Sequence, residues 1–388
     1  MKLLIIPSWY PTDIHPESGT FFKDRAMILQ RCGFSITIVT HVLHSTRDIL
    51  KFNSEVNNEN PTKENEVLIY KTESVNLFPK IPKRAFKMYK DSILPLVKNV
   101  VEKSKPEFVF INSSLYGGAA VARYLHSNMI PFMVSEHLKE FIIDGEFSIF
   151  EKNCISECYK YASKIIATSD ALKSNIIKKF NIDRKKVMVI PNPADSSYFL
   201  PKREKLDNPF TFLSIALLRS EKRLDLLIKA FAKLHKIIPN IVLTIIGDGP
   251  EKSNLQLLSQ KLQINDRVNF IGYQKKAVVA DVIRNHDVLV LSSDVETFGV
   301  VLVEAMTVGL PVIATKCGGP ESIVLPDTGI LIEPNNSTEL YTAMKNIIDK
   351  YDEFDSIKIR EIALKSYSDN AYGNNIREAI NSVISASN

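Results

Sequence analysis

Two glutamates and a glycine stand close together in residues 294–306, which read DVETFGVVLVEAM. Glu296 and Glu304 bracket the Phe298-Gly299 step and an aliphatic run. A carboxylate among apolar residues loses hydration free energy unless a polar partner meets it. Two interpretations therefore stay open: Glu304 lies on a solvated helix face, or it lines a site that binds a polar ligand.

The elements around these glutamates favour a site for a sugar diphosphate. VLVLSSDVE predicts a strand with its exit loop, and TFGVVLVEAMTVG predicts a helix. Gly299 allows close approach of a ligand, and the unpaired N–H groups of 299–301 carry partial positive charge that suits a diphosphate. One turn further in, Glu304 can accept hydrogen bonds from two ribose hydroxyls, and Glu296 can bind a second polyol. Val300 belongs to the same helix start.

Cationic and other polar residues follow other predicted strands. LLRSEKRLD supplies Arg219, Lys222 and Arg223, which can stabilise negative charge on a departing diphosphate. His137 follows a strand in VSEHLKEF, where a structural and a functional role are about equally expected. Gly19 precedes a helix, and either its backbone approaches a phosphate or an acceptor, or it forms only a turn.

The elements that must position these residues form two series. Short aliphatic runs separated by helical patterns indicate parallel strands buried on both faces. Two such series predict an α/β chain of two doubly wound domains. Because these sheets bind ligands at the carboxyl ends of their strands, we expect function in a cleft between the facing domains. The runs of the two series are 2–7, 35–40, 67–72, 107–113, 131–137, 164–169 and 187–192, then 210–217, 241–247, 268–273, 288–293, 311–316 and 329–334.

The expected organisation has four parts. An N-terminal acceptor-side domain over 1–195 is followed by a polar linker over 196–208. The nucleotide-sugar domain covers 209–367, and a helix over 368–388 can cross back to the first domain. No GxGxxG follows the first strand, which excludes a dinucleotide fingerprint there.

The composition and the apolar runs narrow the possible classes of protein further. The chain has 388 residues, 45% of them apolar, but no uncharged apolar run of about 18 residues that would span a membrane. The N-terminal run ends at Pro7 and indicates a strand rather than a signal peptide. The four cysteines show no zinc spacing and are expected to be reduced cytoplasmic thiols.

The net charge of +5 is concentrated in one segment. Residues 80–105 contain eight basic and two acidic side chains. Such a segment can lie peripherally on an anionic membrane, or it can form a solvated helical face, and both interpretations stay open.

Several stretches resemble a known family. DVETFGVVLVEAMTVGLPVIATKCGGPESIV, IIGDGPEKSNL and EKRLDLLIKAF resemble the second domain of retaining glycosyltransferases of family 4, which have the GT-B fold. PSWYPTDIHPESGTFFKDRAMIL and SEHLKEF resemble first domains in the branch that builds bacterial surface polysaccharides. The resemblance implies transfer of a sugar from a UDP- or GDP-sugar to a glycan or lipid-linked acceptor, with retained configuration. It implies no metal, no other cofactor and no nucleic-acid partner.

The resemblance also assigns roles to residues. Glu304 would hold the ribose and Glu296 the transferring sugar, while Lys222 would meet the diphosphate and His137 the donor sugar. The family's usual arginine position holds Leu217, and Arg219 is expected to replace that arginine. Further substrate-binding positions are Phe298, Gly299, Val300, Gly19 and Tyr273, which follows the strand bordering the base pocket.

Two other classes remain as alternatives. The chain can be a nucleotide-sugar-binding partner subunit without catalysis, or a GT-B enzyme of other chemistry, such as a nucleotide-sugar 2-epimerase or a phosphorylase with pyridoxal phosphate. Donor hydrolysis separates the first alternative from a transferase.

Overall fold

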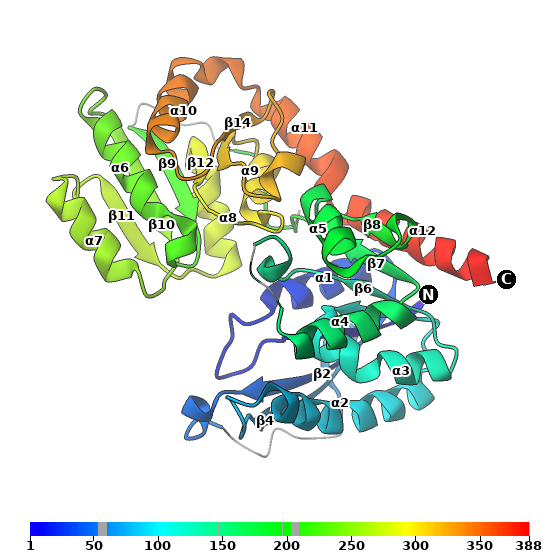
Figure 1. Cartoon of the computed structure of the whole chain (residues 1–388). Coiled ribbons are helices and arrows are strands. Elements are labelled where there is room, and N and C mark those ends of the chain that lie inside the picture. The colour runs from blue at the N-terminus through cyan, green and yellow to red at the C-terminus, as the bar shows by residue number, and fades with distance from the viewer. Residues whose placement is uncertain (53–59, 144, 146, 196, 203–208, 388) are drawn as a thin grey trace. The chain divides into compact units, whose positions relative to one another are not determined.

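The structure divides the chain into two compact units, shown in Figure 1. This computed structural model describes residues 1–387 except 53–59, 144, 146, 196 and 203–208. Unit 1 comprises Met1–Thr168, Leu172–Ile190 and Tyr372–Asn388, and unit 2 comprises Ser169–Ala171 and Pro191–Ala371. Residues 191–195, expected in the first domain, thus belong to unit 2, and part of the expected linker lies outside the described residues.

Unit 1 contains an eight-stranded sheet in the order β3-β4-β2-β1-β5-β6-β7-β8. All strand pairs are parallel except β3 with β4. Each aliphatic run of the first series became a strand, and β3 is an addition that the sequence patterns did not predict. The strands are β1 (Lys2–Pro7), β2 (Ser35–His44), β3 (Thr62–Glu64), β4 (Val67–Val75), β5 (Phe108–Asn112), β6 (Phe132–Ser135), β7 (Lys164–Ala167) and β8 (Val187–Val189).

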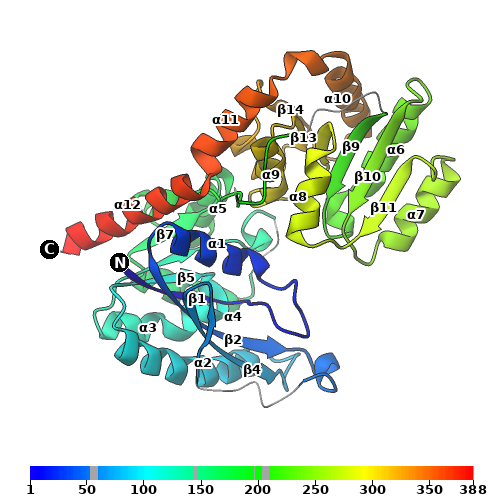
Figure 2. The same cartoon turned by 180° about the vertical axis from the view of Figure 1, so that it is seen from behind.

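Helices cover both faces of this sheet, which explains why its strands are apolar throughout. Along β1, Leu3 and Ile5 pack with α1 (Thr20–Arg31) and α12 (Asp369–Ser387), whereas Leu4 and Ile6 pack with the helices of the opposite face. Figure 2 shows α1 and α12 on their side of the sheet. The opposite face carries α2 (Pro82–Ser104), α3 (Ala119–Ser127), α4 (Ile149–Tyr161) and part of α5 (Asp170–Phe180).

The basic segment 80–105 forms α2, and its apolar residues serve the core. Tyr89, Ile93 and Val97 are buried against the sheet, while Lys83, Arg84 and Lys87 are exposed. The apolar residues of this segment therefore pack in the core of unit 1. Within the described part of the chain, no helix has both the length and the apolar character needed to cross a membrane.

Unit 2 contains a six-stranded, fully parallel sheet in the order β11-β10-β9-β12-β13-β14. Every run of the second series became one of its strands. They are β9 (Phe210–Ile215), β10 (Ile241–Ile246), β11 (Val268–Gly272), β12 (Val288–Leu291), β13 (Val312–Thr315) and β14 (Gly329–Ile332).

Two helical layers enclose this second sheet. One apolar core contains residues of α6 (Leu224–His235), α7 (Lys252–Lys261) and α10 (Ser337–Asp349). The other contains residues of α8 (Lys276–Arg284), α9 (Val300–Val308) and α11 (Ser356–Tyr367). Both units are thus doubly wound α/β folds, as predicted.

Each sheet has a switch point, which is a pair of neighbouring strands whose following helices cover opposite faces of the sheet. In unit 2 the neighbours β9 and β12 lead to α6 and α9, which cover opposite faces. In unit 1 the neighbours β1 and β5 lead to α1 and α3 in the same way. Loops that diverge from neighbouring strand ends leave a crevice, and ligands of doubly wound sheets bind there.

Candidate active site

The switch point of unit 2 brings a lysine and a glutamate together. Lys222 lies in the short helix η6 (Ser220–Lys222) after β9, and Glu296 lies in the loop after β12. The ammonium Nζ of Lys222 forms an ion pair with Glu296 Oε1, and Ser293 Oγ donates to the same oxygen at 3.2 Å. Both charged side chains are about one-fifth exposed. A cation and a carboxylate predicted from separate motifs therefore meet at the expected strand ends.

Backbone contacts hold the Glu296 loop in place. Glu296 N donates to Cys317 O at 3.1 Å, and Gly319 N donates to Glu296 O at 2.8 Å. A Cβ atom on Gly319 would lie 2.3 Å from the Cα of Phe298. The loop after β13 thus supports the loop after β12 at a distance that only glycine permits.

The three basic residues after β9 have different surroundings. Arg223 Nε lies 3.2 Å from Asp225 Oδ1, and its Nη1 lies 3.4 Å from Asp294 Oδ2, so Arg223 links the β9 and β12 loops. Arg219 is exposed at the start of η6. Leu217, at the family's usual arginine position, is 53% exposed. Of the three cations, Lys222 alone is paired with Glu296 in the described structure, and the role of Arg219 stays a prediction.

Helix α9 begins at this switch point. Gly299 is its N-cap, with a left-handed φ of 97°, and Val300 opens the helix half-buried. The sequence VVLVEAMTV is almost entirely apolar because the helix is packed in the core, and Glu304 is its one carboxylate. Glu304 is half-buried, one turn inside the helix.

Two of the predicted substrate-binding side chains, Phe298 and Tyr273, differ in burial. The ring of Phe298 is 2% exposed and packs edge-on against Tyr367 at 5.9 Å, so it supports the loop from within the core. Only its backbone is available to a ligand. Tyr273 follows the edge strand β11 and is 58% exposed.

In unit 1, Gly19 and His137 both lie near the start of α1. Gly19 is the N-cap of α1 with φ 67°, and a Cβ there would lie 2.5 Å from Trp9 O. The ring of His137 packs edge-on against Phe21 and Phe22, and its Nε2 lies 2.8 Å from Ser135 Oγ. Burial and the nearby Arg25 guanidinium lower the pKa of His137 well below its ordinary value, so the ring is neutral at pH 7.

A buried polar group beside His137 was missed by the sequence analysis. Arg25 is 5% exposed, and its Nη2 donates to Asn112 Oδ1 at 2.6 Å. Glu136 accepts hydrogen bonds from Ser114 N at 3.0 Å and from Tyr159 Oη at 3.1 Å, and burial raises its pKa to about 7. The signal was present, because Asn112 and Glu136 are polar residues that end apolar runs.

Two family descriptions match the chain one after the other. Residues 29–198 match "Glycosyltransferase Family 4", and residues 198–362 match "Glycosyl transferases group 1". Two doubly wound units, each matched largely by one of these two descriptions, define a glycosyltransferase of the GT-B class. The chain belongs to family 4 of that class. The resemblance to family 4 glycosyltransferases with the GT-B fold, stated from the sequence, is confirmed.

Known relatives agree with this placement. The phosphatidylinositol N-acetylglucosaminyltransferase gpi3 subunit of Schizosaccharomyces pombe is 28% identical over 269 residues, which cover 67% of this chain and 57% of that protein. The lipopolysaccharide 1,6-galactosyltransferase of Salmonella typhimurium is 32% identical over 192 residues, 48% of this chain and 50% of that protein. The chain thus spans between half and three-fifths of the length of these relatives.

A solved structure shows the same fold over the whole chain. HepE of Anabaena in complex with UDP has a TM-score of 0.74 and 20% identity, and the match covers 98% of this chain and all of that chain. The predicted GT-B fold is therefore confirmed.

Proposed function

We propose that this protein is a retaining glycosyltransferase that moves a sugar from a nucleotide-diphosphate donor to a lipid-linked glycan acceptor in bacterial polysaccharide biosynthesis. The contact between Lys222 and Glu296 at the switch point of unit 2 carries this proposal. It joins a cation suited to a diphosphate with a carboxylate suited to sugar hydroxyls, beside the start of α9. A UDP-sugar is the donor to test first, because HepE, which shares the fold, was solved with UDP.

The proposed chemistry uses the groups of unit 2 to stabilise the leaving diphosphate. As the bond from the anomeric carbon to the diphosphate oxygen breaks, Lys222, Arg219 and the first N–H groups of α9 offset the growing negative charge. Glu296 holds hydroxyls of the transferring sugar, and Glu304 holds the ribose. The acceptor hydroxyl attacks from the same face, and its proton passes to the departing phosphate oxygen. No step of this scheme uses a metal ion.

The lipid-linked acceptor rests on two observations. Both relatives carry a lipid-containing molecule in their names, phosphatidylinositol in one and lipopolysaccharide in the other. In unit 1, the exposed basic residues at the start of α2 can hold the protein peripherally on an anionic cytoplasmic membrane surface, where such acceptors lie.

The first experiment identifies the donor and tests the site together. A thermal-shift screen of nucleoside diphosphates and their sugars should raise the melting temperature with the true donor, because a ligand that binds only the folded state stabilises it. Transfer or slow hydrolysis of that donor is then measured for wild type, Lys222→Ala and Glu296→Ala.

We expect both variants to lose at least about 100-fold in turnover, which corresponds to one strong transition-state contact. Lys345→Ala is the matched control, since Lys345 forms an exposed ion pair with Asp349 on α10 of the same unit. Full activity of both site variants would contradict the assigned roles. Donor binding without any hydrolysis or transfer would favour the binding-subunit alternative.

A further inference from the structure

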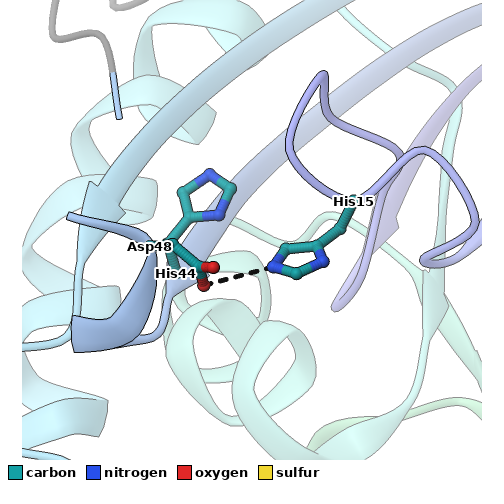
Figure 3. A group of neighbouring side chains, drawn as sticks. All are labelled: His15, His44 and Asp48. Carbon is teal, nitrogen blue, oxygen red and sulfur yellow. Dashed lines mark hydrogen bonds and ion pairs between the residues drawn. The ribbon is translucent and has the colours of Figure 1, made fainter. Parts of the chain in front are cut away.

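Three potential metal ligands from separate segments of unit 1 lie together. His15 is in the loop after β1, His44 ends β2, and Asp48 ends the short helix η1 (Thr46–Asp48). Each offers one ligand atom, and these atoms all lie within 4.8 Å of one another. Figure 3 shows the three side chains turned toward a common point.

The ring of His44 has an unused nitrogen inside the protein. His44 is 2% exposed, and its Nε2 lies 2.7 Å from Glu73 Oε2 on β4. When Nε2 carries the proton and donates to that carboxylate, Nδ1 has a bare lone pair. Nδ1 is buried and has no hydrogen-bond partner among the described residues. In Figure 3 one ring nitrogen of His44 faces Asp48 and His15.

A histidine three residues earlier on the same strand shows the contrast. His41 Nδ1 lies 2.9 Å from Thr72 Oγ1, and its Nε2 lies 2.9 Å from Ser74 Oγ. Both of its nitrogens are satisfied, as expected for a structural histidine. A histidine on this strand can therefore have partners for both ring nitrogens, and His44 has none for Nδ1 among the described residues. A buried polar atom without a partner costs free energy of folding unless a ligand meets it.

The other two ligands are already held near each other. His15 Nε2 lies 3.1 Å from Asp48 Oδ2, which also accepts from Ser45 N at 3.2 Å in a capping box. The cap fixes the Asp48 carboxylate, while the His15 side chain is 43% exposed. An exposed ligand on a loop gives an ion a path to the site and room to adjust.

We propose that His15, His44 and Asp48 bind a divalent transition-metal ion, with Zn²⁺ as the best-fitting ion. Two imidazoles and one carboxylate favour zinc or its first-row neighbours over Mg²⁺ and Ca²⁺, which prefer oxygen ligands. Ligand atoms of a tetrahedral zinc site lie about 3.3 Å apart, so atoms up to 4.8 Å apart must approach by at most about 1.5 Å. The His15 loop can supply this movement.

Glu73 is a positioning residue for this ion. A metal-bound histidine almost always donates its other N–H to a carboxylate or carbonyl, which fixes the ring and its tautomer. The pair of His44 with Glu73 has this arrangement before any ion is bound. Three protein ligands also leave a coordination position for water or for an oxygen of an incoming molecule.

The test measures zinc binding directly. The full chain without a histidine tag is stripped with a chelator, then titrated with ZnCl₂ in a calorimeter, and its visible spectrum is recorded with Co²⁺. We expect one ion per chain and the intense bands of tetrahedral cobalt. His15→Ala and Asp48→Asn should weaken binding by at least about tenfold, and Glu73→Gln by about 10–100-fold.

The control is His126→Ala, which removes an exposed histidine on α3 and should bind zinc like wild type. His15 is exposed, so His15→Ala should melt at nearly the wild-type temperature. No stoichiometric ion in wild type, or equal zinc affinity in wild type and His15→Ala, would overturn the site, and the second result would assign the ion to other groups such as thiols. Donor binding by unit 2 is measured separately, so its failure cannot be mistaken for failure here.

Discussion

The Glu136 carboxyl group makes the stability of unit 1 depend on pH. Burial raises its pKa from 4.5 to about 7, which corresponds to about 3 kcal/mol. Because the folded pKa is raised, this stability is fully present below pH 4.5 and is lost as the pH rises through about 7. We predict that Glu136→Gln, which stays neutral, removes this loss. Denaturant unfolding of both proteins between about pH 5 and 8 measures it, and an identical pH slope for the two would contradict the prediction.

Single residues show which parts of the site a sequence reveals. The meeting of Glu296 with Lys222 could be predicted because both residues follow parallel strands, whose carboxyl ends lie at one edge of the sheet. Their roles in catalysis stay a prediction. The burial of Phe298 could not be predicted, because its residue type fits a ligand contact and a core position equally well. The partners of Arg25 and Glu136 lie on other elements, so only folding shows that these side chains are buried and hydrogen-bonded.

At the scale of elements, the packing of the β13 loop against the β12 loop gives a second prediction. Gly319→Ala should displace the Phe298 backbone, because its new Cβ would lie 2.3 Å from the Cα of Phe298. We expect about 2 kcal/mol of lost stability and a drop in turnover of at least tenfold, about 1.4 kcal/mol in activation free energy. Turnover and thermal melting check this.

Gly272→Ala is the matched control for that change. Gly272 has a positive φ of 72°, but a Cβ there would meet nothing within 4 Å. It should lose only about 1 kcal/mol from backbone strain and keep its turnover. Equal turnover of the two variants would refute the supporting role of Gly319.

The exposed start of α2 gives the third prediction. Lys83, Arg84 and Lys87 point away from the core, so reversing all three to Glu should release the protein from anionic vesicles without unfolding it. Each charge near such a surface contributes about 1 kcal/mol. The control reverses the exposed Lys229 and Lys233 of α6 and Lys236, its C-cap. Co-sedimentation is the measurement, and the membrane proposal fails if both triple variants sediment like wild type.

Elements also explain why the proposed zinc site escaped the sequence analysis. The aliphatic run 35–40 predicted a strand that stops before His44. In the structure β2 continues to His44 because it pairs with β4, from Thr37 opposite Leu68 to His44 opposite Val75. That pairing places His44 beside Glu73. Because this contact joins two separate strands, the hydrophobic periodicity of neither strand predicts it.

At the scale of the whole molecule, the last helix belongs to the unit that begins the chain. Tyr372, Ile376 and Ile380 of α12 are buried in the same core as Leu3 and Ile5 of β1. Ile380→Ala should cost about 2–4 kcal/mol, because it leaves a cavity there. Ser382→Ala, an exposed position on the same helix, should cost less than about 0.5 kcal/mol. Denaturant unfolding compares them, and equal stability of both variants would show that α12 contributes little to unit 1.

The doubly wound architecture of both units was the most predictable feature, because continuous apolar strands require cover on two faces. The sequence analysis named the return of α12 to unit 1 only as a possibility, because an amphipathic segment indicates that it packs but not where. Pairing across more than three hundred residues leaves no local pattern.

The packing of α12 in unit 1 affects the order in which the two units can fold during synthesis on the ribosome. The strands of unit 1 are translated before unit 2, yet the helix that completes one side of their core is translated after unit 2. Unit 2 has its whole sheet available while translation continues, whereas one apolar face of unit 1 stays uncovered until α12 has been synthesised. A polypeptide truncated before α12 would therefore keep that apolar face exposed, where chaperones and proteases can recognise it.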